Sequence, residues 1–367
     1  MIVVRRFAPA RARVVVVVVV VVGASSNAAR VPPPPPPHLA LMPRRATALV
    51  ACVVQNDPGR ASACTKRDNI ARVAAIVDRA LDDDDLGRDV GIIVCAECFA
   101  HEYTLTAANA RAWSESGAGE VDGECVTWAR ALAAQRRCVV VVGYVRRVGQ
   151  ALFNAQALID ADGVVRSQHH KTHLYDMDEA WAEEGDGFTT NVITVKTVVR
   201  EENASGARVV ARGTADVRCT QAICMDINPY QFKAPWDAYE LANAVKAAGE
   251  TNEDGKHLHQ LLLFSSAWTN AHPNDAEELK RAEVDVSDVL SYWYARLEPL
   301  RGTKTHFVCA NRIGEENLIK FCGCSCVIDM RAQRVLTCIE PGVEDARLVP
   351  ILLDEDEDHR DDLVRDE

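Results

Sequence analysis

The sequence lacks the patterns that mark the most easily recognised classes of protein. Its longest apolar run is the nine valines at positions 14–22, whereas a membrane-spanning helix needs about 20 apolar residues. It contains neither the glycine fingerprint of dinucleotide-binding folds nor a phosphate-binding P-loop. A membrane-embedded enzyme is therefore disfavoured, and no motif indicates a bound nucleotide.

Positive charge is scarce outside the N-terminal region. The 367-residue chain has a net charge of −12, but residues 1–56 contain seven arginines and no acidic residue, so the remainder carries −19. Nucleic-acid binding requires a basic face, and anionic lipid attracts basic segments. The acidic body predicts a protein without a nucleic-acid or membrane partner.

Cysteine is abundant, with 13 residues, but its spacing does not predict a metal site. Cys95 and Cys98 have C-x-x-C spacing, yet no second such pair follows at the spacing of a zinc site. Cys322, Cys324 and Cys326 alternate, which would place them on one face of a strand. Small buried residues of a reduced protein are the favoured interpretation, and we predict neither a metal nor a cofactor.

Both ends of the chain differ in composition from the body. Residues 1–46 combine the valine run with six consecutive prolines, and three interpretations stay open: a mitochondrial or plastid transit peptide, a secretory signal, or an untranslated stretch before a start at Met42. Residues 353–367 are rich in acids and predict a disordered tail. Residues 47–352 are expected to form the folded domain of a cytoplasmic protein, unless the first segment directs it to an organelle.

The body alternates short apolar strands with amphipathic helices. Strands are predicted at 48–54, 90–96, 138–145, 217–224, 261–268, 306–314, 321–329 and 334–340, and helices at 66–81, 120–136, 234–248 and 284–300. Residues 153–171 indicate a hairpin, residues 199–216 a polar surface excursion, and residues 249–257 a polar insertion. Continuous apolar strands interleaved with helices predict an α/β fold in which helices cover mixed sheets.

Three polar residues lie where predicted buried strands end. Glu97 follows GIIVCA, Lys171 follows the hairpin, and Cys224 follows QAI. Active sites of α/β folds gather at the carboxyl ends of strands. A carboxylate base, a cation that stabilises an oxyanion, and a thiol are together the components of an acyl-transfer site. Each residue alone is more often a solvated charge or a core cysteine, so the surrounding sequence has to decide.

The surrounding motifs resemble those of the nitrilase, or carbon–nitrogen hydrolase, superfamily. GIIVCAECFAHEY resembles its glutamate motif, KTHLYDMDE its lysine motif and AICMDINPY its cysteine motif, in the same order, although Ala96 stands where the family usually has proline. SSAW and CANRIGEEN, farther along, are also typical. The resemblance implies an α-β-β-α sandwich of two mixed sheets flanked by helices, with Glu97, Lys171 and Cys224 as the catalytic residues.

Within this superfamily, four segments resemble protein N-terminal amidases, which convert an N-terminal Asn or Gln to Asp or Glu in the N-degron pathway. The segments are CMDINPYQFKAPWDAYELA, HHKTHLYDMDEAW, SYWYARLEPL and ANRIGEEN. The resemblance implies that Glu97 is the general base and acid, that Cys224 forms a thioester with release of ammonia, and that the Lys171 ammonium stabilises the oxyanion. The expected partners are protein or peptide N termini that begin with Asn or Gln, and a homodimer stays open.

Three further residues are candidates for supporting roles. The resemblance implies that the backbone N–H of Met225 helps to hold the oxyanion. It also places Glu179, eight residues after the lysine, where related amidases have a second glutamate, although a surface acid is nearly as good an interpretation. Asp226 would support the nucleophile loop or contact the α-ammonium of the substrate. The histidines at 169, 170 and 173 are interpreted as packing residues.

Two other functions stay open. One is a small-molecule amidase or nitrilase of the ω-amidase or carbamoylase type, from which an entrance wide enough for a peptide N terminus would distinguish an N-terminal amidase. The other is an inactive binding protein on the same fold, which the presence of all three catalytic residue types disfavours.

Overall fold

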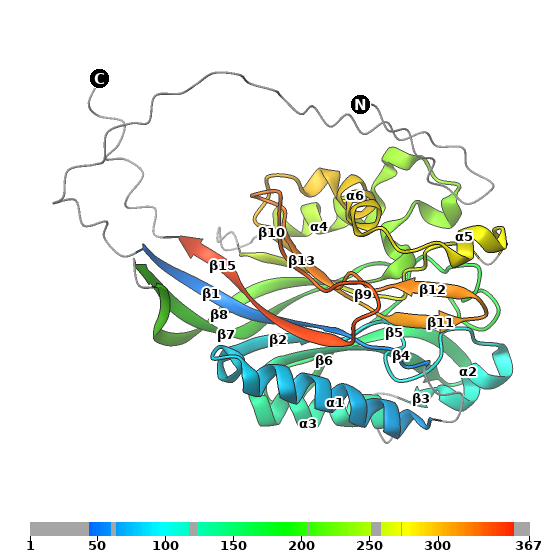
Figure 1. Ribbon diagram of the computed structural model, residues 1–367, viewed down its shortest axis with the longest axis horizontal. Helices are drawn as coiled ribbons and strands as arrows, with labels where there is room; N and C mark the ends of the chain where they lie inside the picture. Colours follow the sequence, from blue (N-terminus) through cyan, green and yellow to red (C-terminus); the bar gives the residue numbers. More distant parts are fainter. Residues whose placement is uncertain are drawn as a thin grey trace.

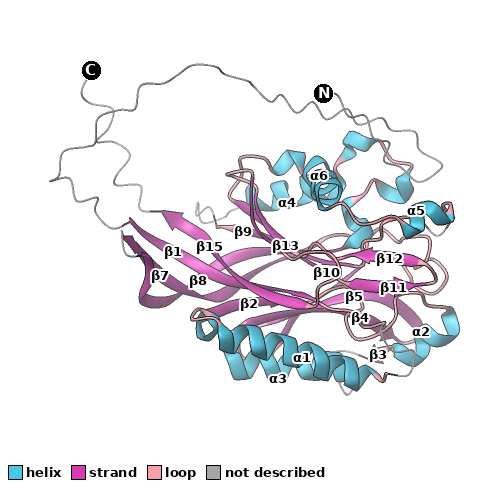
Figure 2. Ribbon diagram, in the orientation of Figure 1, coloured by secondary structure: helices cyan, strands magenta, loops and turns pink. Residues whose placement is uncertain are grey.

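The computed structural model describes residues 44–59, 64–116, 123–203, 206–250, 258–272 and 274–355. They form four layers, in which two layers of strands pack face to face and helices cover both outer faces (Figure 1). Figure 2 shows the helices α1 (Lys66–Asp83) and α3 (Glu124–Arg136) on one side of the strands, and α4 (Glu240–Glu250) and α6 (Val286–Arg296) on the other. The predicted α-β-β-α class is confirmed.

The first strand layer comes from the N-terminal part of the described chain. Its strands are β1 (Arg44–Gln55), β2 (Val90–Val94), β3 (Glu115–Ser116), β4 (Val139–Val148), β5 (Ala151–Ile159) and β6 (Val165–His170), with the short helix α2 (Ala107–Trp113) after β2. β1, β2 and β4 are parallel neighbours, and β5 and β6 extend the sheet in antiparallel fashion. The parallel strands are covered on both faces, which explains their unbroken apolar sequences.

The second strand layer also contains a group of parallel strands. Its strands are β7 (Thr189–Asn203), β8 (Gly206–Ile223), β9 (Gln260–Ser266), β10 (Thr305–Asn311), β13 (Cys326–Asp329) and β14 (Arg334–Cys338). β8, β9 and β10 run parallel, β13 pairs antiparallel with β10, and β14 pairs antiparallel with β13. A separate small pair, β11 (Ile313–Glu316) with β12 (Ile319–Cys322), and the short helix α5 (Glu277–Arg281) lie outside this layer.

The two strand layers are joined by one continuous hydrogen-bonded path. The start of β1 pairs antiparallel with the outer part of β7, from Arg44 opposite Glu202 to Ala48 opposite Val198. The path therefore runs without a break in the order β14-β13-β10-β9-β8-β7-β1-β2-β4-β5-β6, and β15 (Asp345–Glu355) pairs with β1 off this path. Both implied sheets are present as layers, but they share an edge connection.

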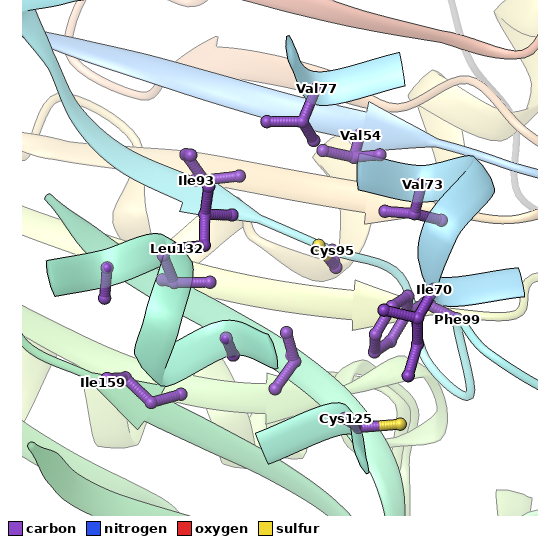
Figure 3. Packing of buried hydrophobic residues seen from close by; sticks show 14 of the residues in the cluster. Val54, Ile70, Val73, Val77, Ile93, Cys95, Phe99, Cys125, Leu132 and Ile159 are labelled. Atoms are coloured by element: carbon purple, nitrogen blue, oxygen red, sulfur yellow. The ribbon is translucent and has the colours of Figure 1, made fainter. Parts of the chain in front are cut away.

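Three apolar clusters hold the layers together. Side chains of β1, β2 and β4 meet those of β8, β9 and β10 between the strand layers. On the outer face of the first layer, α1 and α3 cover β1 and β2, and Figure 3 shows Leu132 of α3 beside Ile93 and Ile70 of α1 beside Phe99. On the opposite face, Trp293 of α6 packs with α4 and the strands beneath. The strand ends are thus fixed from both sides.

Helix α1 shows how the sequence specifies these layers. The 3.6-residue apolar spacing predicts a helix over 66–81, and the helix observed is Lys66–Asp83. Thr65 forms a capping box with Asp68, since each side chain accepts a hydrogen bond from the backbone N–H of the other residue. The apolar face defined by this spacing is the face that packs on the sheet.

The structure differs from the sequence prediction in its peripheral segments. Residues 199–216 are predicted as a surface excursion, but the described residues 199–203 and 206–216 belong to β7 and β8, and the sequence pattern predicts neither β7 nor β15. Helix α4 begins at Glu240 rather than 234. Pro235 and Tyr239, whose backbone is left-handed (φ +45°), prevent a continuous helix before that residue.

Several predictions fall partly or wholly outside the described residues. These are the segment 1–46, most of the insertion 249–257, and most of the tail 353–367. Among the helices of the described ranges, none is long and apolar enough to cross a membrane.

Candidate active site

The ends of β2, β6 and β8 bring three polar side chains into the interior of the fold. Glu97 lies three residues beyond β2, whereas Lys171 and Cys224 follow β6 and β8 directly. Glu97 and Lys171 are completely buried, and Cys224 is 7% exposed. The Cys224 thiol is close enough to both charged groups for each of them to shift its pKa. The structure therefore brings the three predicted residues together.

Lys171 is held by two carboxylates. Its Nζ donates to Glu97 Oε1 at 2.8 Å and to Asp178 Oδ2 at 2.6 Å. Asn154 on β5 links the same two carboxylates, because its Nδ2 lies 2.7 Å from Glu97 Oε1 and 3.1 Å from Asp178 Oδ1. The Tyr103 hydroxyl lies 3.4 Å from both Lys171 Nζ and Asp178 Oδ2. In this buried polar network, each member fixes the position of the others.

Burial and charge act in opposite directions on the network. Burial raises the pKa of Glu97, Lys171 lowers it, and the Asp178 carboxylate raises it again. The pKa of Glu97 therefore stays above its ordinary value. Burial alone would lower the pKa of Lys171, but Asp178 and Glu97 raise it well above its ordinary value. Lys171 thus stays an ammonium, and Glu97 binds a proton more readily than an exposed glutamate does.

A glycine on β4 sets the position of the Glu97 backbone. A Cβ atom on Gly143 would lie 2.7 Å from the carbonyl oxygen of Ala96 and 2.8 Å from Glu97 Cα. Both distances are shorter than van der Waals contact, so the segment after β2 can lie against β4 only where this strand has no side chain. The close approach aims Glu97 at the network.

The backbone places Cys224 in a left-handed conformation. Its φ is +41°, and it is the first residue of a short 3-10 turn, Cys224–Ile227. Positive φ is uncommon outside glycine and costs about 1–3 kcal/mol, and such residues cluster at functional sites. Other contacts must therefore stabilise this turn.

Asp226 supplies those contacts. Its Oδ1 accepts the backbone N–H groups of Thr172 and His173 at 2.9 and 2.8 Å. Its Oδ2 accepts the backbone N–H of Ile223 at 2.8 Å and lies 2.9 Å from His169 Nε2. Because the residues at 172 and 173 follow the lysine directly, one buried carboxylate ties the nucleophile turn to the lysine segment.

The electrostatic surroundings keep the Cys224 thiol protonated. Burial is the main reason that the pKa of this thiol is raised, and the Glu97 carboxylate raises it further. Lys171, the Ser266 hydroxyl and the Ala267 N–H act in the opposite direction without overcoming burial. Since the thiolate is the nucleophilic form of cysteine, a nucleophilic attack by Cys224 would require a base to remove its proton.

A cavity of about 520 Å³ adjoins Cys224. Such a volume is typical of small-molecule and cofactor sites, which span about 300–1,000 Å³. Its lining includes Cys224 and Met225, and its walls are largely aromatic and apolar, with Phe232, Trp236, Trp268, Val289 and Tyr292 among them. Four carboxylates also line it (Asp275, Glu283, Asp285 and Asp288), and no lysine or arginine does within the described ranges. This charge distribution favours a cationic ligand.

Helix α6 provides one wall of the cavity. Four lining residues recur three or four positions apart and so share one face of the helix: Asp285, Asp288, Val289 and Tyr292. The Tyr292 hydroxyl donates to Asn228 Oδ1 at 2.5 Å, and Arg296 Nε donates to the Ile227 carbonyl at 2.9 Å. The acidic wall is therefore anchored to the nucleophile turn.

The acid that contacts the lysine is Asp178, one residue before the candidate Glu179. Glu179 is exposed, whereas Asp178 is buried against Lys171. The Asp178 N–H donates to the Tyr175 carbonyl at 2.7 Å and closes a tight turn. This turn brings the seventh residue after the lysine, not the eighth, back to Lys171. The run DMDE offers three acids, and no signal in it distinguishes the buried one.

The three nearby histidines face different ways. His169 supports the nucleophile turn, His170 stacks on Phe153 with ring centroids 3.8 Å apart, and His173 Nδ1 lies 3.0 Å from the Asn228 carbonyl. In the part of the chain that the structure describes, no group of three or more His, Cys, Asp or Glu side chains is arranged to hold a metal ion.

Comparison with known proteins gives relatives of one kind. The protein N-terminal amidase of Schizosaccharomyces pombe is 29% identical over 231 residues, which cover 59% of this chain and 73% of the relative. The protein N-terminal amidase of Saccharomyces cerevisiae is 24% identical over 153 residues, which cover 41% of this chain and 31% of that protein.

Solved structures share the fold. The crystal structure of an N-terminal amidase with an Asn-Glu-Ala peptide superposes with a TM-score of 0.66 at 16% identity, covering 84% of this chain and 99% of that chain. The Saccharomyces cerevisiae nitrilase-superfamily protein Nit3 superposes with a TM-score of 0.57 at 15% identity, covering 84% and 90%.

The family model settles the broader relationship. The model of the carbon–nitrogen hydrolase family matches residues 49–238, which is more than half of the chain and includes all three residues of the buried Glu-Lys-Cys constellation. The chain therefore belongs to the carbon–nitrogen hydrolase family.

Proposed function

We propose that this protein is a protein N-terminal amidase, which hydrolyses the side-chain carboxamide of an N-terminal Asn or Gln to give Asp or Glu and ammonia. The observation that carries the proposal is that Cys224 lines a cavity with an acidic wall and lies close to the buried Glu97 and Lys171. The relatives add support, since solved N-terminal amidases hold Asn-Glu and Gln-Val peptides.

Glu97 is the proposed base. Its Oε1 is occupied by Lys171 and Asn154, while its Oε2 has no hydrogen-bond partner among the described residues. The free oxygen is available to take the Cys224 proton as the sulfur attacks the carboxamide carbon. The same carboxyl group then protonates the departing ammonia, for which a raised pKa is an advantage.

The oxyanion of the tetrahedral intermediate is held by the Lys171 ammonium and the backbone N–H of Met225. Met225 follows the nucleophile in the first turn of a 3-10 segment, where backbone N–H groups lack an acceptor within the turn. One such donor is typically worth about 3–4 kcal/mol of barrier. Water, activated by Glu97, then hydrolyses the thioester and frees Cys224.

The supporting acids have separate roles in this proposal. Asp178 holds Lys171 and helps to keep it protonated. Asp226 supports the nucleophile turn rather than the substrate, since both of its oxygens already face donors from the protein. Glu179, on the surface, takes no direct part.

The shape and charge of the cavity favour a peptide N terminus. A protein substrate presents an α-ammonium beside the reacting carboxamide, and the four wall carboxylates attract that cation. The volume exceeds what one small amide requires, which leaves room for the residues that follow the first. The product, a protein beginning with Asp or Glu, would enter the N-degron pathway in the cytoplasm.

An assay of ammonia release tests the proposal. Peptides that begin with Asn or Gln should be hydrolysed, their N-acetylated forms should not, and Cys224→Ala should abolish the reaction. Cys219→Ala is the matched control, because Cys219 is a buried core cysteine of the same strand. Equal turnover of free glutamine would overturn the proposal in favour of a small-molecule amidase, and undiminished release by Cys224→Ala would refute the site.

A further inference from the structure

The small β11–β12 pair lies outside both strand layers, yet it contacts the segment that follows β2. Glu316, the last residue of β11, makes this contact with its carboxylate. Both of its oxygens accept the Tyr103 N–H at 3.0 Å, and its Oε2 also accepts the Thr104 N–H at 2.8 Å. A side chain of β11 therefore fixes the backbone that carries Tyr103.

Arg312 holds Glu316 in place from inside the fold. The Arg312 side chain has no exposed surface, and its Nη2 donates to Glu316 Oε1 at 2.5 Å, while its Nη1 donates to the His101 carbonyl at 3.2 Å. Its guanidinium carbon also lies 4.2 Å from the centroid of the Phe321 ring on β12. Burial would raise the pKa of Glu316, but Arg312 and the two backbone N–H groups lower it below its ordinary value. Glu316 is thus a charged acceptor, which strengthens its hydrogen bonds.

The same small sheet fixes the ring of Tyr103. Phe321 packs edge-on against this ring, with the centroids 5.8 Å apart and the planes at 83°. Tyr103 is buried, and its hydroxyl lies 3.4 Å from both Lys171 Nζ and Asp178 Oδ2. Because backbone and ring are both held by β11 and β12, the hydroxyl is fixed beside the Lys171 ammonium.

The Tyr103 hydroxyl completes the hydrogen bonds of that ammonium. An ammonium has three N–H donors. Glu97 and Asp178, at 2.8 and 2.6 Å, accept two of them, and the neutral Tyr103 hydroxyl is a third partner. Its distance of 3.4 Å exceeds the usual N–H···O range of about 2.7–3.2 Å. An oxyanion can therefore displace this contact, which until then restricts the position of Nζ.

We propose that Glu316 is a positioning residue for the amide hydrolysis, acting through Tyr103 to keep the Lys171 ammonium where it reaches the oxyanion. The inference rests on the proposed function, because that function gives Lys171 its role at the oxyanion. Glu316 does not touch the substrate in this proposal. Its effect should therefore appear in kcat rather than in KM, and it should depend on the Tyr103 hydroxyl.

Initial rates of the full chain test this dependence in four forms: the unchanged protein, Glu316→Gln, Tyr103→Phe and the double variant. Glu316→Gln keeps the size of the side chain but turns an NH₂ group towards N–H donors. Each single variant should lose about tenfold in kcat with KM within about threefold, because a displaced catalytic group costs rate. The double variant should also lose about tenfold, not about 100-fold, since both changes act through one hydroxyl.

Glu315→Gln is the matched control, because Glu315 precedes Glu316 on the same strand but is exposed. It should leave kcat unchanged. Losses that multiply in the double variant would overturn the proposal, and so would a Glu316→Gln protein that unfolds at lower temperature without losing kcat. If Glu316→Gln does not fold, Tyr103→Phe decides alone, and an unchanged kcat would refute the role of the hydroxyl.

The choice of substrate separates this inference from the proposed function. The rates are measured with an Asn-initiated peptide and with free glutamine. If the unchanged protein hydrolyses free glutamine equally well, the proposed function fails, but the ratios among the variants still decide the role of Glu316. An unchanged protein that hydrolyses neither substrate would refute both.

Discussion

Replacing Asp178 by asparagine separates the network seen in the structure from the one implied by sequence spacing. Four donors converge on this carboxylate: Lys171 Nζ at 2.6 Å, Asn154 Nδ2 and the Tyr175 N–H at 3.1 Å, and the Tyr103 hydroxyl at 3.4 Å. An amide has the same shape as a carboxylate, but one of its two oxygens is replaced by an NH₂ group. In Asp178→Asn, at least one of these four donors would therefore face another donor instead of an acceptor.

The expected loss follows from the interaction with Lys171. A hydrogen bond to a charged group contributes about 1.5–3 kcal/mol. If the variant loses about 2–3 kcal/mol of transition-state stabilisation, kcat/KM falls about 30- to 150-fold, because each 1.36 kcal/mol changes the rate tenfold. The matched control is Glu179→Gln, one residue away on the surface, which should leave kcat/KM within about twofold since exposed acids contribute little.

A pH profile distinguishes this role from a merely structural one. Glu97 must be ionised to act as a base, so activity declines as the pH falls through its pKa. Asp178 contributes to raising that pKa. Removing the charge should therefore move the acid limb of kcat/KM to lower pH, measured as initial rates of ammonia release from an Asn-initiated peptide. An unmoved acid limb, or a larger loss for Glu179→Gln than for Asp178→Asn, would refute the reasoning.

Three further changes test the surroundings of the nucleophile. Asp226→Asn should lower the unfolding free energy by about 3 kcal/mol at neutral pH. Hydrogen bonds keep the pKa of Asp226 low despite burial, so this loss should shrink as the pH falls through that pKa. A pH-independent difference in denaturant unfolding between the variant and the unchanged protein would contradict this. Gly143→Ala should reduce kcat at least tenfold, because its Cβ would push on the backbone at Glu97, and an unchanged kcat would refute that contact. Asp288→Asn should raise KM for Asn-initiated peptides about three- to tenfold with little change in kcat, and a KM that stays constant would remove this carboxylate from the cationic site.

The proposed Glu-Lys-Cys site was accessible to sequence reasoning because each member follows a predicted strand, which is strongly apolar before Glu97 and Cys224. Runs such as GIIVCA and QAIC carry a clear strand signal, and the chemistry of α/β folds collects at such ends. The inner strands follow unbroken apolar runs and helix α1 follows a 3.6-residue apolar spacing, so both were predictable within a few residues. β7 and β15 were not, because each is covered mainly on one face and carries charged residues along its length.

The positions that the sequence could not determine are those fixed by hydrogen bonds over long distances. Asp178 and Glu179 are adjacent acids of nearly equal chemistry, and only the closure of the turn on Tyr175 determines which of them meets Lys171. Asp226 is similar, because its partners at 172 and 173 lie more than fifty residues earlier. Side-chain spacing along one strand or turn carries no information about such contacts, since they depend on how two strand ends from different layers meet. A motif therefore identifies the residues that react, whereas the residues that hold them in place have to be found from the fold.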